Sequence, residues 1–151
     1  MLFHTHILLG ILFFLLLGRL FPPGHDLLFF LLVLLGSVLP DLDSQYSQIN
    51  QWSGVIGKII TFFTKHRGLL HSFFFHSFLF FLISFFFPFS YASALFLGYL
   101  AHILADGLTV QGVQLFYPFS SYKTRGPVRV GGLMEEIILL VLVFLIIESL
   151  F

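Results

Sequence analysis

Long apolar stretches are the feature of this sequence that most limits its fold. Five of them occur, at about residues 7–21, 27–39, 69–88, 91–108 and 133–150. Hydrophobic residues make up 58% of the chain and charged residues 9%, with a mean hydropathy of +1.03. A soluble domain of 151 residues has too few interior positions to bury this much apolar surface. The sequence therefore predicts a protein whose solvent is the lipid bilayer.

Each apolar stretch is predicted to be an α-helix, because a lone strand in lipid leaves its backbone polar groups without partners. The expected fold class is all-α: one membrane-embedded domain over residues 1–151, a polytopic bundle of about five transmembrane helices. A Pro-Pro-Gly turn at residues 22–24 ends the first helix, and Pro40 and Pro88 end the second and third. The second stretch is short for a span of ~20 residues, so it is expected to be tilted little, to thin the bilayer locally or to be partly re-entrant.

Composition excludes several kinds of function. The chain contains no cysteine, so disulfides, thiolate metal ligands and cysteine nucleophiles are ruled out. The formal net charge is zero, so no nucleic-acid partner is expected. The N-terminus has no basic segment before its apolar run and no small-residue cleavage site after it. We therefore expect the first stretch to be a permanent span.

Up-and-down threading of five helices would bring most ionisable residues to one membrane face. The starts of the odd-numbered helices and the ends of the even-numbered helices meet on the face that holds the N-terminus. The residues expected there are His6, Asp41, Asp43, His66, His71, His102, Asp106 and Glu135. If the second stretch does not span, this grouping breaks.

The basic residues predict the orientation. All of them except Arg19 lie in loops on the predicted site face: Lys58, Lys65, Arg67, Lys123, Arg125 and Arg129. By the positive-inside rule, the site and the N-terminus face the cytoplasm and the C-terminus lies on the other side. The expected location is therefore the inner or plasma membrane, with several spans and with membrane lipids as partners. The sequence does not predict an oligomeric state.

Two pairs of ionisable residues, a His–Asp pair and an Asp–Asp pair, indicate metal binding. His102 and Asp106 are four residues apart, so they project from one face of a helix. Ionisable groups within membrane spans are costly and usually functional, which favours a ligand pair over a structural contact. Asp41 and Asp43 follow Pro40 in a turn, where two carboxylates can bind one ion or bridge two. Their alternative is a solvated cluster at a helix C-terminus.

The segment HRGLLHS supplies His66, Arg67 and His71, and a turn between the two histidines can direct both inward. Arg67 suits an anionic oxygen such as phosphate, or alternatively anchors the chain at the headgroups. Glu135 is a candidate general base or ligand, although acidic residues at a helix start are favourable in any case. For His76 a satisfied core position is favoured over a contact behind the metal ligands. The role of Glu136 stays open.

Imidazoles and carboxylates without thiolates suit a divalent metal, with zinc preferred and manganese or iron(II) as alternatives. At least six candidate ligands make either one or two ions plausible.

The motifs THILLG, GSVLPDLDS, HRGLLHSF and GYLAHILADGLTVQGVQLFYPFS, followed by an arginine, resemble the LexA-regulated, membrane-bound, metal-dependent hydrolases of the YdjM-like family. The resemblance covers nearly the whole chain and implies metal ligands at His6, Asp41, Asp43, His66, His71, His102 and Asp106. A more distant likeness of the TH, PDxD and HxxxD pattern to zinc-dependent phospholipase C suggests a headgroup phosphoester as substrate.

The preferred hypothesis is a hydrolase that cleaves a phosphoester of a lipid or lipid-linked substrate with a metal-activated water. Its predicted catalytic residues are Asp41, Asp43, Arg67 and Glu135, with Arg125 or Arg129 assisting at the anion. One alternative is a metal transporter, but the far halves of the helices lack the polar groups that a transport path needs. The other is a structural metal site, in which protein fills every coordination position.

Overall fold

The chain is all-helical in the part that the structure describes. A computed structural model describes residues 1–21 and 27–151. The α-helices are α1 (Phe3–Leu17), α2 (Leu27–Val38), α3 (Gln48–Trp52), α4 (Val55–Phe63), α5 (Phe73–Phe86), α6 (Phe89–Gly107) and α7 (Leu133–Leu150). Short 3-10 turns are η1 (Gly18–Leu20), η2 (Leu39–Asp43) and η3 (Leu69–His71). The predicted all-α fold class is confirmed for these residues.

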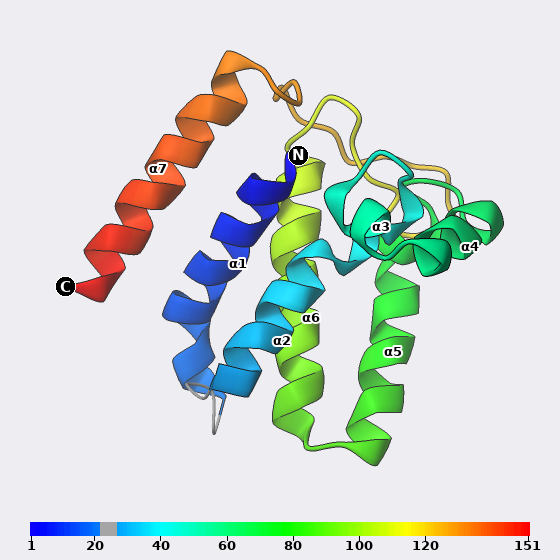
Figure 1. The fold of residues 1–151 in the computed structure, drawn as a ribbon, viewed down its shortest axis with the longest axis horizontal. Coiled ribbons are helices and arrows are strands. Elements are labelled where there is room, and N and C mark those ends of the chain that lie inside the picture. Colours follow the sequence, from blue (N-terminus) through cyan, green and yellow to red (C-terminus); the bar gives the residue numbers. More distant parts are fainter. Residues whose placement is uncertain (22–26) are drawn as a thin grey trace.

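The five predicted apolar stretches correspond to α1, α2, α5, α6 and α7 (Figure 1). The helix predicted over about residues 69–88 begins later than expected, because His71 lies in η3 and α5 begins only at Phe73. Helices α3 and α4 precede η3. Gly54, between them, has a φ of 58° that only glycine adopts easily, and α4 begins at the next residue. The predicted Pro-Pro-Gly turn at residues 22–24 lies outside the described residues.

One helical segment of the described residues, Phe3–Leu20, is long and apolar enough by itself to cross a membrane. It comprises α1 and η1. Helix α5 is apolar but shorter. Helix α2 has 12 residues, which at 1.5 Å per residue extend roughly 18 Å, less than the ~30 Å hydrocarbon core.

Helix α6 lies at the centre of the packing, in contact with α1, α2 and α5, and α7 packs against α1 (Figure 1). Two glycines let α2 and α6 approach each other closely. A methyl group added to Gly98 would overlap the carbonyl oxygen of Val33, and one added to Gly36 would overlap that of Leu95. Small residues at a crossing are typical of helices that pack in membranes, where close backbone approach supplies the attraction.

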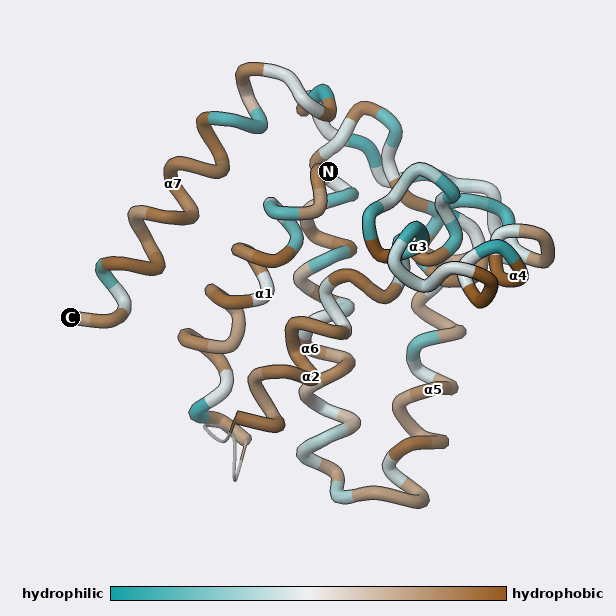
Figure 2. Tube along the Cα trace, in the orientation of Figure 1, coloured by the Kyte–Doolittle hydropathy of each residue, from teal (hydrophilic) through white to brown (hydrophobic). Residues whose placement is uncertain are grey.

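Polar residues gather at one end of the bundle, near the N-terminus and around α3 and α4, whereas α1, α2, α5 and α7 are mostly apolar (Figure 2). The segment between α6 and α7 lies over the polar end. It is fixed by backbone hydrogen bonds between Val113 and Thr124, and by one from Phe73 N to Leu115 O of 2.8 Å. The ends of α2 and α6 and the starts of α1 and α5 therefore meet beneath it.

Candidate metal centre

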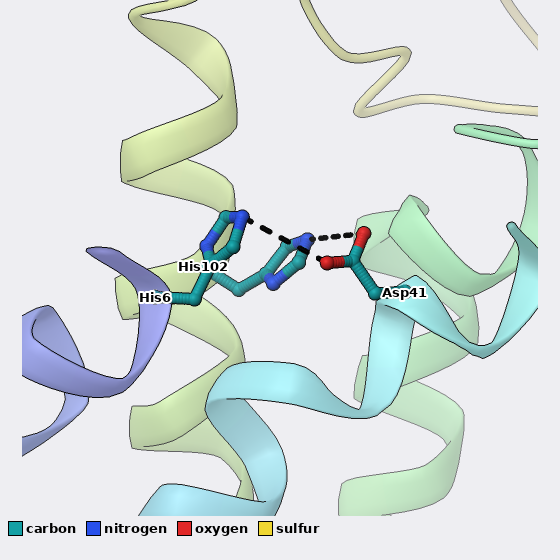
Figure 3. A group of neighbouring side chains, drawn as sticks. All are labelled: His6, Asp41 and His102. Atoms are coloured by element: carbon teal, nitrogen blue, oxygen red, sulfur yellow. Dashed lines mark ion pairs between the residues drawn. The ribbon is translucent and has the colours of Figure 1, made fainter. Parts of the chain in front are cut away.

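Several elements direct imidazoles and carboxylates toward one point at the polar end. Helix α1 supplies His6, α6 supplies His102 and Asp106, and the turns η2 and η3 supply the remaining groups, Asp41, Asp43 and His71. Side chains of α1, α6 and η2 face one another in Figure 3. The three imidazoles and Asp106 are completely buried, whereas the side chain of Asp41 is 13% exposed. Burying this many ionisable groups is costly unless they are paired or bind a cation.

The first group of candidate ligands is His6, Asp41 and His102. The Nε2 atoms of both imidazoles lie 3.9 Å from the Asp41 carboxylate, one near each oxygen. The two rings stack with centroids 3.9 Å apart and an angle of 11° between their planes. One ligand atom from each residue lies within 4.8 Å of the other two. This spacing lets one small ion contact all three after minor adjustment.

The second group, His71, His102 and Asp106, shares His102 with the first. The Nε2 atoms of His71 and His102 are 3.1 Å apart. They lie 3.6 and 3.9 Å, respectively, from Oδ2 of Asp106. The two groups adjoin, so they form a continuous cluster with space for one ion or an adjacent pair.

Hydrogen bonds fix the orientation of two of these rings. The Nδ1 of His102 donates to the carbonyl oxygen of Ser37 at 2.8 Å, since that oxygen can only accept. The Nδ1 of His71 bonds to Oδ2 of Asp43 at 3.1 Å. In neutral rings the two Nε2 lone pairs then face each other, which requires a proton or a metal ion between them. When two imidazole nitrogens bind one zinc ion, each at about 2.0–2.1 Å, the nitrogens lie roughly 3 Å apart. The 3.1 Å between the Nε2 atoms of His71 and His102 therefore fits a shared metal ion.

The ring of His6 lacks the hydrogen bonds that a buried imidazole normally makes. Neither of its nitrogens has a hydrogen-bond partner within the described residues, and the Nε2 lies 3.5 Å from Oδ1 of Asp106. Buried polar atoms are nearly always satisfied, so such a nitrogen needs an explanation. A cation between His6, Asp41 and Asp106 would provide a partner for the Nε2.

Arg67 is a buried part of this cluster. Its Nη2 is 2.9 Å from Oδ2 of Asp106, and its Nη1 donates to Thr109 Oγ1 at 3.0 Å and to Gly112 O at 2.9 Å. The amino group of Met1 contacts the other oxygen of Asp106. Arg67 is 8% exposed, so the alternative that this side chain anchors the chain at the lipid headgroups is wrong. Its Nε remains without a partner in the part that the structure describes.

The backbone of Arg67 is also unusual. Its φ is 60°, a left-handed conformation that a side chain with a Cβ adopts at a cost. The N–H of this residue donates to Oδ2 of Asp43 at 3.0 Å. Such strained positions persist only where the surrounding contacts hold them, and they concentrate at functional sites.

Asp43 and His66, both predicted as ligands, lie outside the two ligand groups. The carboxylate of Asp43 is occupied by His66 Nδ1 at 2.7 Å on one oxygen and by His71 Nδ1 on the other. It therefore lies behind His71 and orients it, as a carboxylate behind a metal-binding histidine does. The side chain of His66 is 45% exposed and lies at the edge of the cluster.

These contacts shift the pKa values of two groups in the turns. Burial lowers the pKa of the His71 imidazole, but the hydrogen bonds and charges of Asp106 and Asp43 outweigh it, so that the pKa rises to about 9. Burial raises the pKa of the Asp43 carboxyl, but the hydrogen bonds from His66 and His71 outweigh it and lower the pKa below its ordinary value.

Glu135 is not brought into either ligand group. Its buried carboxylate accepts hydrogen bonds from Leu2 N at 2.6 Å, Thr5 Oγ1 at 3.0 Å and Gly131 N at 2.7 Å. These bonds tie the start of α7 to the start of α1. Arg125 and Arg129, predicted to assist at an anion, are exposed.

Comparison with known proteins places the chain in a family. The family model described as YdjM inner membrane protein matches residues 1–149. The chain belongs to the YdjM inner membrane protein family. The predicted family and the predicted membrane location are thereby confirmed, whereas the likeness to zinc-dependent phospholipase C stays a prediction.

This YdjM family member also has a relative in Bacillus subtilis (strain 168), the protein described as "Uncharacterized protein YvsG". The two are 30% identical over 107 residues, which make up 69% of this chain and 66% of YvsG. The matched segment thus spans about two thirds of that relative's length. No solved structure matches the chain.

Sequence reasoning missed three positions around the cluster of this YdjM family member. Ser37 contributes a backbone carbonyl, for which a sequence carries no signal. Thr109 accepts from Arg67 after α6 has ended. Tyr99 donates its hydroxyl to His71 O at 3.1 Å, and it precedes His102 by three positions, so helical periodicity could have placed it on the same face.

The position of His76 agrees with the favoured interpretation, since it is 5% exposed in the core. Its ring stacks on Tyr99 with centroids 3.6 Å apart and 8° between the planes. Its Nε2 has no hydrogen-bond partner within the described residues, so the ring is not fully satisfied.

Two pockets open at the edge of the cluster. The first, of about 400 Å³, is lined by Asp41, His66 and Arg67 together with polar residues such as Ser44. The second, of about 660 Å³, lies between η2 and α4 and reaches Asp43. A polar molecule can therefore approach the buried ligand groups from the polar end of the bundle in this member of the YdjM family.

Proposed function

We propose that this chain is a membrane-bound, metal-dependent hydrolase that cleaves a phosphoester of a lipid or lipid-linked substrate. The observation that carries the proposal is the convergence of three imidazole Nε2 atoms with the Asp41 and Asp106 carboxylates below a polar pocket. The donor set suits zinc, with manganese or iron(II) as alternatives, and accommodates one or two ions. A bound divalent ion would supply Lewis-acid activation of water and neutralise negative charge.

The residues of the chain suggest a division of roles. Asp41 is the most accessible carboxylate of the ligand groups and lines the pocket, so it can accept a proton from an incoming water. Arg67 lines the same pocket, and its buried Nε has no partner within the described residues, so its guanidinium group suits an anionic oxygen of the substrate. Asp43 holds the ring of His71 in place.

We further propose that α1, α2, α5, α6 and α7 all cross the membrane, with the N-terminus and the cluster on the cytoplasmic side. Two observations support this topology. Large apolar side chains are exposed along α5 and α7, where lipid would cover them. The basic residues lie at the cluster end, apart from Arg19. The cluster would then lie at headgroup depth, where lipid phosphoesters are found.

A second candidate is a metal site that only holds the helices together. The complete burial of His6, His71 and His102 favours it, because structural sites are closed. The pocket that reaches Asp41 and Arg67 favours catalysis, because a hydrolase needs an accessible position for water and substrate.

The experiment that separates these candidates compares His102→Ala with His4→Ala. His102 belongs to both ligand groups, whereas His4 is an exposed histidine at the rim of the same pocket. Purified protein is analysed for bound metal and for release of phosphate or headgroup from phospholipid vesicles. We expect metal and turnover in the wild type, metal at the wild-type level in His4→Ala, and loss of both metal and turnover in His102→Ala.

Other outcomes would contradict the proposal. Bound metal with no turnover of any phospholipid tested would support the second candidate, a metal site that only holds the helices together. Metal uptake into sealed vesicles without lipid turnover would instead indicate transport. Equal metal content in His102→Ala and the wild type would show that this cluster is not the metal-binding site.

A further inference from the structure

Helix α4 presents an apolar face that no part of the described chain covers. Its large apolar side chains at positions 55, 56, 59, 62 and 63 are each between 53% and 83% exposed. At 100° per residue these positions fall within an arc of about 120° on one side of the helix. A soluble protein would turn such a face inward. Its exposure here indicates that lipid or another molecule covers it.

The opposite side of α4 is the side that packs on the protein. Gly57 lies against Asn50, and a methyl group added there would overlap the backbone of Asn50. The buried side chain of Asn50 donates to Gly57 O at 2.9 Å and to Leu42 O at 2.6 Å. These bonds fix α4 to the turn η2, which carries Asp41 and Asp43. The orientation of the apolar face is therefore built into the fold.

The position of α4 points to lipid as the occupant. It lies at the cluster end of the bundle and runs across the direction of α5 in Figure 1. Exposed aromatic residues also occur at the start of α5, where Phe74 meets Phe119 of the segment between α6 and α7 with ring centroids 5.0 Å apart. Lys58 and Lys65 are exposed beside the apolar face, which suits anionic headgroups.

We propose that α4 is an interfacial helix that lies in the plane of the membrane, with its apolar face among the acyl chains and Lys58 among anionic headgroups. In this position it forms the membrane-side wall of the pocket of about 660 Å³ that reaches Asp43 and His66. Headgroups would thus border the mouth of that pocket. The placement of α4 requires the membrane location of the chain and does not depend on hydrolase activity.

Spin labelling tests the proposal directly, since the chain has no cysteine and each introduced one is the sole labelling site. Ile59→Cys and Phe62→Cys probe the apolar face. Lys58→Cys and Thr61→Cys are the matched controls, because these two positions lie outside the apolar face and line the pocket of about 660 Å³. The labelled full chain is reconstituted in phosphatidylcholine–phosphatidylglycerol vesicles. We measure collisions of each label with oxygen, which concentrates in acyl chains, and with a water-soluble nickel chelate.

The expected result is high oxygen and low nickel accessibility at positions 59 and 62, and the reverse at 58 and 61. High nickel accessibility at all four positions would overturn the proposal in favour of a face exposed to water. Low accessibility to both reagents at 59 and 62 would overturn it in favour of a protein partner. Spin–spin broadening would then identify that partner as a second copy of the chain.

Trp52 gives an independent measurement on the unmodified protein. It is the single tryptophan, is 70% exposed and contacts Phe3 at the junction before α4. We expect its fluorescence to be quenched by lipids that carry a nitroxide near the headgroup, and to be protected from aqueous iodide. Strong iodide quenching without lipid quenching would contradict an interfacial position.

Discussion

The carboxylate of Asp43 is shared by two imidazoles and one backbone amide, and none of these contacts faces the centre of the cluster. Its position explains how a side chain outside the ligand groups can control them. It fixes the ring plane of His71, and through Arg67 N it also holds a strained backbone position in place.

Replacing Asp43 with asparagine is therefore expected to weaken metal binding without removing a ligand. We expect a loss of roughly 10- to 100-fold in affinity, typical of changes behind a metal-binding histidine. Titration of metal-free protein with zinc measures it. His66→Ala, which removes the partner on the other oxygen, should weaken binding less. Unchanged affinity in Asp43→Asn would show that Asp43 does not orient His71.

The raised pKa of His71 predicts a pH dependence for the metal-free protein. Its pKa in the folded state, about 9, exceeds its ordinary value of 6.5. The stability that the bound proton contributes is thus fully present below pH 6.5 and is lost as the pH rises through 9. After chelation, the apparent unfolding temperature in detergent should fall across this range. His71→Asn, which cannot titrate, should show a flatter curve. Equal slopes would contradict the prediction.

At the scale of the elements, the crossing of α2 and α6 connects packing with the site. Gly98 lies one helical turn before His102, and Gly36 lies directly before Ser37, whose carbonyl orients the His102 ring. Close approach of the two backbones at these glycines is what brings the carbonyl within hydrogen-bond distance of the imidazole.

Gly98→Ala should consequently destabilise the protein, because the added methyl group overlaps the backbone of α2. We expect a loss of about 1–3 kcal/mol, the usual range for overpacking. Gly107→Ala is a control in the same helix, since a methyl group there would meet only a side-chain carbon of Thr124 at 3.9 Å. Unfolding in detergent measures both variants. Equal stability of the two variants would show that α2 and α6 can move apart at this crossing without cost.

At the scale of the whole molecule, the loops that carry the cluster lie at one end of the bundle, and the proposed topology places them all in the cytoplasm. Single cysteines test this in a chain that has none of its own. Gln51→Cys lies at the cluster end and Phe151→Cys at the C-terminus, and both positions are exposed.

In intact cells, a membrane-impermeant maleimide should label Phe151→Cys but should label Gln51→Cys only after lysis. Labelling of both positions from the same side would mean that an even number of the segments α5, α6 and α7 crosses the membrane. The reverse pattern, with Gln51→Cys labelled in intact cells and Phe151→Cys only after lysis, would mean that α2, which is short and precedes both positions, does not cross.

The sequence alone predicted the membrane location of this protein and the gathering of its ionisable side chains at one end of the bundle. Apolar run length predicts helices in lipid, and alternating direction brings His6, Asp41, His71, His102 and Asp106 to one end, because both depend only on order along the chain. Helical spacing likewise placed His102 and Asp106 on one face.

Only the tertiary structure decided which of these groups meet. Asp43 lies behind His71, Glu135 binds the start of α1, and Arg67 is buried against Asp106. Each outcome depends on contacts between segments far apart in the sequence and on backbone atoms, such as the carbonyl of Ser37, that every residue carries alike. Residue order sets the membrane depth of a side chain, but the rotation and close packing of the helices set its partners.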